Sequence, residues 1–290
     1  MSRFYIPLGC VLAVLSLSAC EIRQTAPNPI LAVNTHYVAM GSSFAAGPGV
    51  TESVEGSPAR CGRSKDNYAQ LLARRLDLNL DDVSCSGAKT DDILMPSRHL
   101  PAQIDAVDVD TGLVTITIGG NDLGYIGGLM AASCMEHQLS EPNSGARKCW
   151  PLPAPPNASD YKAVEDRMSA IAQQIRQRAP NSVLVFVDYA TVINPRQLCE
   201  GAPLPLEFAQ NSQDIADTLV EITERVANKN NALVIKASTL TRQHHTCSTT
   251  PWMRGYPAPN WTFKSIPYHP TLEGMIAIAD GLEDRLKSKS

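Results

Sequence analysis

The sequence lacks the features that would mark it as a nucleic-acid-binding protein or a metalloprotein. Lysine and arginine residues form no cluster, and the formal net charge of the 290 residues is −4. A positively charged surface of the kind that binds nucleic acid is therefore not expected. No two cysteines have the Cys-x-x-Cys spacing, and no other spacing typical of zinc ligands occurs. We expect no nucleic-acid partner, no metal and no cofactor.

The N-terminal segment has the pattern of an export signal. Arg3 precedes an apolar stretch from Phe4 to Leu17, which is too short for a membrane-spanning helix. Leu17-Ser18-Ala19-Cys20 then resembles the lipobox of bacterial lipoproteins, which are cut before the cysteine and receive a lipid on its sulfur. We expect a signal peptide over 1–19, a lipid on Cys20, a tether over 20–35 and one domain over 36–290. An ordinary secretory signal cut nearby is the alternative, and both predict export to or beyond the bacterial cell envelope.

The remaining cysteines are typical of an exported protein. Apart from one cysteine inside the signal and the proposed lipid site there are six: Cys61, Cys85, Cys134, Cys149, Cys199 and Cys247. An even number in an oxidising compartment predicts three disulfides. Six cysteines allow fifteen different pairings, so the sequence leaves the connectivity open. Sequential pairing would close three separate connecting regions.

Short apolar runs alternate along the chain with longer amphipathic segments. The runs predict five strands: His36–Gly41, VSCSG from Val83, Leu113–Gly120, SVLVFVD from Ser182 and ALVIKA from Ala232. Helices are expected from Asn67, from Tyr161, over 206–226 and after Pro270, whereas the proline-rich segment 130–160 indicates a long loop. This alternation predicts an α/β fold, a parallel sheet with helices on both faces, in which all strands end at one edge. We find no internal repeat and no second domain.

Four candidate functional positions fall at that edge. Ser43 follows the first strand in a turn of small residues, and a serine nucleophile needs an adjacent base. His269 stands directly before Pro270, where the last helix is expected to begin. Gly87 ends the second predicted strand, and Asn121 follows the third. Together with the backbone N–H of Ser43, they could supply three hydrogen-bond donors to an oxyanion.

Each of these residues also has a purely structural interpretation. Ser42 and Ser43 could cap a helix, Gly87 could serve a tight turn, and Asn121-Asp122 could form a polar turn. His269 could simply precede a helix. The coincidence favours catalysis, because the four residue types that acyl transfer requires are all expected at one edge of one sheet.

The same four blocks, in the same order, resemble the SGNH or GDSL-like hydrolases. The blocks are GSSF, CSGA, GGND and the HP dipeptide, and they extend from Tyr37 to the last helix. The resemblance implies a flavodoxin-like α/β/α sandwich with a five-stranded parallel sheet and ester hydrolysis through an acyl-enzyme. It also implies that Ser43 is the nucleophile, that His269 is the base, and that Ser43 N–H, Gly87 and Asn121 form the oxyanion hole.

The sequence departs from the family pattern at two positions. Ser42 replaces the aspartate of the G-D-S motif, so Ser42 is an alternative nucleophile, although register favours Ser43. Ile266 replaces the acid three residues before His269. In some secreted, disulfide-stabilised members a backbone carbonyl at that place orients the histidine, and the resemblance implies that the Ile266 carbonyl does so here. Asp188, after the fourth strand, is a second candidate for this role.

We therefore predict an exported, lipid-anchored serine esterase or lipase with a Ser43–His269 dyad. The expected partners are an acyl or lipid-like ester and, through Cys20, a membrane, and we expect a monomer. A carbohydrate O-acetylesterase is one alternative, and a non-catalytic lipoprotein that binds a lipid or glycan is another, favoured by the two missing acids. Several loop residues could line an acyl-chain site or pack around the disulfides: Trp150, Trp252, Met253, Tyr256, Trp261 and Phe263.

Overall fold

The computed structural model describes residue 1 and residues 31–140, 149–256 and 266–287. The expected signal peptide, Cys20 and most of the expected tether lie outside these ranges, as do Trp261 and Phe263. No helix in the described part of the chain is both long and apolar enough to cross a membrane.

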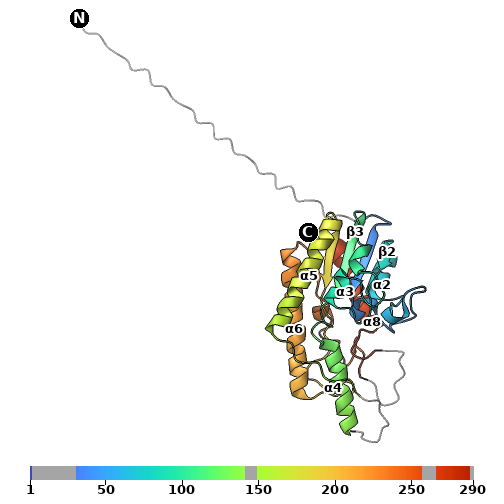
Figure 1. Ribbon diagram of the computed structural model, residues 1–290, viewed down its shortest axis with the longest axis vertical. Helices are drawn as coiled ribbons and strands as arrows, with labels where there is room; N and C mark the ends of the chain where they lie inside the picture. Colours follow the sequence, from blue (N-terminus) through green and yellow to red (C-terminus); the bar gives the residue numbers. More distant parts are fainter. Residues whose placement is uncertain (2–30, 141–148, 257–265, 288–290) are drawn as a thin grey trace.

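The centre of the fold is a sheet of five parallel strands (Figure 1). The order across the sheet is β2-β1-β3-β4-β5, and every neighbouring pair is parallel. This is the flavodoxin-like strand order. The predicted fold class is therefore confirmed. The strands are β1 (His36–Gly41), β2 (Asn79–Asp82), β3 (Thr111–Thr117), β4 (Val183–Val187) and β5 (Leu233–Ile235).

Helices cover both faces of the sheet. One face carries α2 packed against α8, and the other carries α5 packed against α6, with α3 against α5 and α4 against α6 (Figure 1). The α-helices are α1 (Ser43–Ala46), α2 (Tyr68–Leu76), α3 (Thr90–Leu94), α4 (Tyr125–Ser140), α5 (Ala158–Arg178), α6 (Leu206–Lys229), α7 (Ala237–Leu240) and α8 (Leu272–Lys287). Two 3-10 turns complete the described elements: η1 (Ala59–Cys61) and η2 (Gln103–Ala106).

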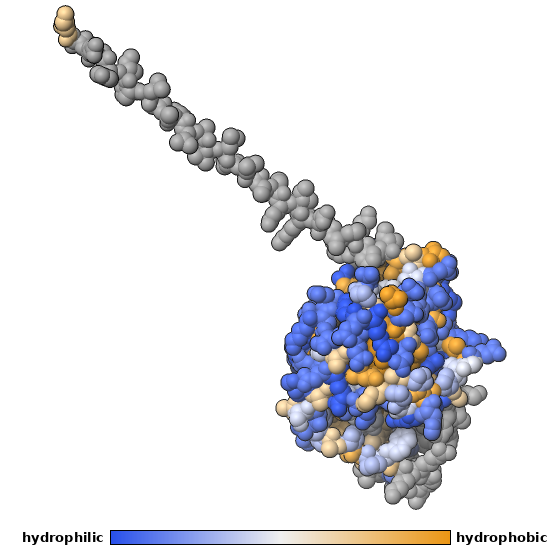
Figure 2. All heavy atoms as spheres, turned by 45° about the horizontal axis from the view of Figure 1, so that its top comes forward, coloured by the Kyte–Doolittle hydropathy of each residue, from blue (hydrophilic) through white to orange (hydrophobic). Residues whose placement is uncertain are grey.

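The core lies between the sheet and these helices. The residues of β1 and β3 are almost all buried, because central parallel strands are covered on both faces. The apolar side of each long helix closes over the sheet, through residues such as Leu72, Ile171, Leu219 and Ile278. On the face shown in Figure 2, hydrophobic residues are interspersed among more numerous hydrophilic ones.

Two predicted elements differ from the structure. The second strand is Asn79–Asp82 rather than the run from Val83, because an edge strand with exposed residues lacks the continuous apolar pattern of a buried one. The segment predicted as a loop from residue 130 begins as a helix, since α4 continues to Ser140. Its buried face includes Leu129, Ala131 and Ala132, which the surrounding polar and proline-rich sequence obscured.

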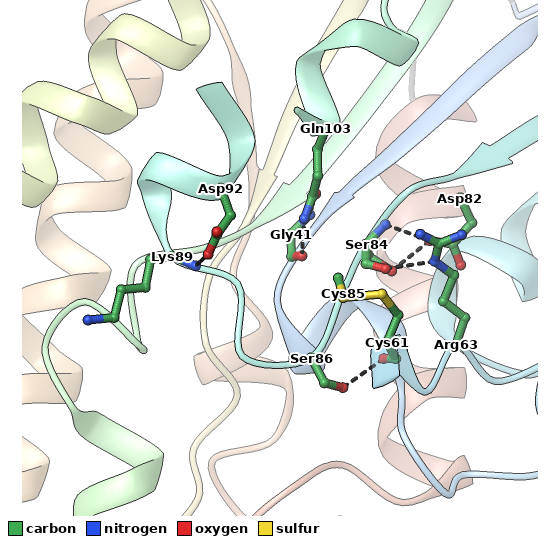
Figure 3. The surroundings of a disulfide bond; sticks show 10 residues. All are labelled: Gly41, Cys61, Arg63, Asp82, Ser84, Cys85, Ser86, Lys89, Asp92 and Gln103. Carbon is green, nitrogen blue, oxygen red and sulfur yellow. Dashed lines mark hydrogen bonds between the residues drawn. A yellow bond between two sulfur atoms is a disulfide. The ribbon is translucent and has the colours of Figure 1, made fainter. Parts of the chain in front are cut away.

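Three disulfides connect the loops. They join Cys61 to Cys85, Cys134 to Cys149 and Cys199 to Cys247. This is the sequential pairing, one of the fifteen that the sequence left open. The first of these bonds lies directly beside the ends of β1 and β2 (Figure 3).

Candidate active site

The turn that carries Ser43 begins at the last residue of β1. Gly41 has φ +132°, and a side chain there would collide with the backbone oxygen of Thr117 on β3, so only glycine fits. The N–H and the carbonyl of Gly41 are both hydrogen-bonded to the side-chain amide of Gln103 (Figure 3). The Gly41 N–H donates to Gln103 Oε1 at 2.7 Å, and Gln103 Nε2 donates to the Gly41 carbonyl at 3.1 Å. The turn is therefore fixed before the serine pair begins.

The two serines of the turn point to different partners. Ser43 Oγ lies 2.7 Å from His269 Nε2, and both residues are largely buried. Ser42 Oγ instead lies 3.0 Å from the hydroxyl of Tyr189. Of the two hydroxyls, the structure brings the one at position 43 to the imidazole.

The carbonyl that orients His269 belongs to Pro267, at 2.8 Å from Nδ1. The prediction of the Ile266 carbonyl is therefore wrong by one residue. Tyr268 has φ +60°, a left-handed conformation that turns the Pro267 carbonyl toward the ring. The segment is held in this form because Tyr268 N–H donates to Arg254 O and Arg254 N–H donates to His269 O. Counting residues from the histidine could not reveal this backbone reversal.

Asp188 does not contact the imidazole in this structure. Its carboxylate accepts hydrogen bonds from the N–H and the hydroxyl of Ser238, both at 2.8 Å. Burial raises the pKa of Asp188 to about 6. Its candidacy as the orienting acid is thus not supported, and among the described residues no carboxylate is hydrogen-bonded to His269.

The tautomer and charge of His269 follow from its surroundings. A carbonyl can only accept, so the ring proton is on Nδ1, and Nε2 is left to accept a proton from Ser43 Oγ. Burial lowers the pKa of His269 to about 4; the bond to Pro267 opposes this change and the nearby Arg254 guanidinium adds to it. The imidazole is therefore neutral at neutral pH, as a general base must be.

Gly87 lies in a loop that is tied down on several sides. Cys85 is bonded to Cys61, and the Ser86 hydroxyl donates to the Cys61 carbonyl at 2.7 Å (Figure 3). Gly87 itself has φ +77°, which favours glycine. Within the described residues, no hydrogen bond uses the backbone N–H of Gly87 or of Ser43. Both groups are therefore available to a ligand.

Asn121 connects the end of β3 to the Gly87 loop. Its Nδ2 donates to the Ala88 carbonyl at 2.9 Å, which leaves one amide proton unused by that bond. The neighbouring Asp122 carboxylate accepts from both the N–H and the hydroxyl of Thr90. The loops that follow β2 and β3 are thereby joined, as an oxyanion site shared between them would require.

Two residues at this edge have no counterpart in the sequence motifs. Tyr189 follows β4, and its hydroxyl contacts both Ser42 and the N–H of Gly120. Arg254 donates to the carbonyls of Gly49 and Pro270, at 2.8 and 3.1 Å. Neither was distinguishable from the sequence, although a tyrosine just after a predicted strand is at the correct edge.

The described aromatic loop residues mostly pack within the protein. Trp252 stacks on His244 with ring centroids 3.5 Å apart, and Met253 is buried. Tyr256 lies 6.4 Å from Tyr268, centroid to centroid. These contacts favour the packing interpretation for all three, whereas Trp150 is exposed.

Comparison with known proteins places the chain in a family. The model of the GDSL-like Lipase/Acylhydrolase family matches residues 39–276, which include every site residue described above. This chain belongs to that family. It is accordingly a carboxylic ester hydrolase of the GDSL type.

One named relative is similar to this chain in sequence, and two solved structures are similar to it in fold. The chain is 27% identical over 245 residues to a lipase of Streptomyces rimosus, covering 83% of this chain and 82% of that lipase. Its fold is similar to phospholipase A1 from Streptomyces albidoflavus NA297, with TM-score 0.70 and 24% identity over 87% of this chain and 99% of that one. The extracellular lipase of Streptomyces rimosus gives TM-score 0.66 and 23% identity, with 86% and 99% covered.

Proposed function

We propose that this GDSL-type hydrolase is an exported serine esterase or lipase that works through a Ser43–His269 dyad. The observation that carries the proposal is the 2.7 Å contact between Ser43 Oγ and His269 Nε2, with the ring oriented from its other nitrogen. A nucleophile, a base and a group that orients the base are the parts that this type of catalysis needs.

The reaction follows from these positions. Ser43 Oγ attacks the acyl carbonyl of the ester while its proton moves to His269 Nε2. The oxyanion accepts hydrogen bonds from the Ser43 N–H, the Gly87 N–H and the free amide proton of Asn121. His269 then gives its proton to the departing alcohol, which leaves the acyl group on Ser43. A water molecule, deprotonated by His269, releases the acid and restores the serine.

The dyad differs from a triad in how it stabilises the imidazolium. The Pro267 carbonyl fixes the tautomer, but as a neutral group it stabilises the positive ring less than a carboxylate would. The low pKa of His269 has the same physical origin, because burial without a carboxylate disfavours the charged ring.

The location and substrate class rest on the sequence and the relatives. The export pattern before Cys20 and the three disulfides support an extracytoplasmic protein. We propose that Cys20 carries a lipid that anchors it to a membrane. The names of the relatives, a lipase and a phospholipase A1, favour acyl esters of lipid type as substrates.

A fluorophosphonate probe tests the nucleophile directly. The folded, oxidised wild type should be labelled, and Ser43→Ala should lose both labelling and hydrolysis of p-nitrophenyl esters, the latter by ~10⁴-fold or more. Ser42→Ala is the matched control, since it removes the neighbouring hydroxyl and should still be labelled. An unlabelled wild type would favour a non-catalytic binding protein, and labelling that survives Ser43→Ala would show that another residue is the nucleophile. Esters of graded chain length then define the acyl preference.

A further inference from the structure

Beneath the catalytic turn, one buried hydroxyl links three strand ends. Tyr189 follows β4 and is 3% exposed. Its hydroxyl oxygen lies 3.0 Å from Ser42 Oγ, after β1, and 3.0 Å from the N of Gly120, after β3. These strands are neighbours in the sheet, in the order β1-β3-β4. A single side chain thus connects the strand ends on which the site is built.

The direction of the bond between Gly120 and Tyr189 is fixed by its donor. The Gly120 N–H can only donate, so the Tyr189 oxygen accepts there, and the one hydroxyl proton of Tyr189 is available to Ser42 Oγ. Ser42 immediately precedes the nucleophile, and Gly120 immediately precedes Asn121. The hydroxyl therefore holds the residue before the nucleophile and the residue before the amide donor at a fixed separation.

Ring contacts extend this link to the base. The Phe44 ring lies 4.7 Å from the Tyr189 ring and 5.1 Å from the His269 ring, centroid to centroid. At the hydroxyl end of the ring, a side chain at Gly120 would place its Cβ 2.6 Å from Tyr189 Cζ. The close approach of the ring thus requires glycine at that position, and the second glycine of GGND has a steric reason.

The partner of Tyr189 is also one of the two positions at which this chain departs from the family motifs. Ser42 stands where the motif has an aspartate, and its side chain is buried at 1% exposure. The hydrogen bond between Ser42 and Tyr189 gives both buried hydroxyls a partner. A charged aspartate at the same buried position would have to lose its hydration, which is unfavourable. Burial raises the pKa of Tyr189 to about 12, so its proton is retained at any ordinary working pH.

We propose that Tyr189 is a positioning residue of this site, whose hydroxyl, through Ser42 and Gly120, sets the nucleophile turn relative to the oxyanion donors. It does not touch the substrate. The proposal rests on the proposed function, because it assigns to Tyr189 an effect on the rate of ester hydrolysis. The distance between the nucleophile and the oxyanion donors matters most in the transition state. Loss of the Tyr189 hydroxyl therefore lowers kcat and leaves KM nearly unchanged.

The test compares two tyrosines that differ in location but not in chemistry. Tyr189→Phe should lower kcat for a p-nitrophenyl ester about tenfold, with KM within about twofold of the wild type. Tyr37→Phe is the matched control, because Tyr37 is fully buried in β1 and bonds to Thr115 Oγ1 at 2.7 Å. It should lose comparable stability in urea unfolding while kcat stays within about twofold of the wild type.

A double-mutant cycle gives a second, independent readout. Ser42→Ala removes the same bond from its other end and serves if Tyr189→Phe does not fold. If the two residues act as a unit, the double variant should lose no more kcat than the worse single variant. An unchanged kcat in Tyr189→Phe, an equal loss in Tyr37→Phe, or losses that multiply in the double variant would each overturn the proposal. A wild type that hydrolyses no ester would instead refute the proposed function together with this role.

Discussion

At the scale of single residues, the burial of His269 determines the pH range in which the site can work. As the proposed base, the imidazole can accept the Ser43 proton only when it is neutral, and burial lowers its pKa from 6.5 to about 4. On the acid side, activity should therefore be kept until the pH falls through about 4. We expect the acid limb of the profile of kcat/KM against pH to have its midpoint near this value, because kcat/KM reports the free enzyme.

Substitutions of Arg254 test whether the acid midpoint of this profile reports the pKa of His269. Its guanidinium lowers the pKa of His269, after the larger effect of burial. Arg254→Gln should therefore move the acid midpoint upward, and Arg254→Lys, which keeps the charge, should leave it closer to the wild type. Circular dichroism must confirm that both variants fold, since Arg254 also bonds to three backbone carbonyls. A wild-type midpoint near 6.5 would contradict the assignment of a buried, neutral base.

Residue identity was more predictable than residue contacts. The motifs pointed to Ser43 and His269, because nucleophile and base chemistry is restricted to few side chains. The Pro267 carbonyl was not predictable, since any residue has a carbonyl and its direction depends on the positive φ of Tyr268. The role of Tyr189 was not predictable for a similar reason, because nothing in the sequence indicates which side chain the Ser42 hydroxyl faces.

At the scale of elements, the loop after β2 owes its position to covalent and polar links rather than to a core of its own. The Cys61–Cys85 bond and the bond from Ser86 to Cys61 O precede Gly87, and Asn121 holds Ala88 just after it. Arg63 adds a bond from Nε to the Ser84 carbonyl at 2.7 Å (Figure 3). The Gly87 donor is thus preorganised from both sides of the loop.

Removal of the first disulfide should therefore impair catalysis beyond its effect on stability. The double variant Cys61→Ala/Cys85→Ala should lose about 3 kcal/mol of unfolding free energy and also show a reduced kcat at a temperature where it remains folded. The measurement is urea unfolding together with steady-state kinetics on the same preparation.

The second disulfide supplies the comparison for this prediction. Cys134→Ala/Cys149→Ala opens a loop of 15 residues' separation, against 24 for the first bond, so the two entropic effects are similar. Because Cys134 lies within α4, whereas the donors Gly87 and Asn121 lie in the loops that follow β2 and β3, its removal should change kcat less. Equal losses of kcat in the two double variants would show that the Cys61–Cys85 bond does not position the Gly87 donor for catalysis.

Elements with a strong apolar pattern were predictable, and those without one were not. The buried strands β1, β3 and β4 and the amphipathic α5 and α6 lie close to their predicted positions. The edge strand β2 is half exposed, so no apolar run marks it. Helix α4 has two glycines in its first turn, and the segment after it is rich in prolines. The disulfide connectivity could not be predicted, because it depends on which loops lie close together in three dimensions, and the order of the cysteines along the chain does not give this.

At the scale of the whole molecule, the parallel sheet separates the entry of the chain from the site. The chain enters the sheet at His36, the first residue of β1, and Ser43 follows the last residue of the same strand. All five strands run in the same direction, so the residues after β1, β2, β3 and β4 that form the site share the opposite edge. An N-terminal attachment therefore acts at the end of the domain remote from catalysis.

This separation predicts that the proposed lipid anchor controls location without controlling chemistry. Expressed in a bacterial host that processes lipoproteins, the wild type should be found in the membrane fraction, and Cys20→Ala should be released in soluble form. Because Ser43, Gly87 and Asn121 follow strand ends at the edge of the sheet opposite His36, kcat/KM of the Cys20→Ala enzyme for a soluble ester should stay within about twofold of the detergent-extracted wild type. Cys10→Ala, which changes a cysteine inside the expected signal peptide, is the control and should remain in the membrane fraction. If Cys20→Ala stays in the membrane fraction, the protein is held there by an anchor other than a lipid on this residue. If Cys20→Ala is released but loses its activity, the N-terminal attachment and the site are coupled across the sheet, which their placement at opposite edges does not explain.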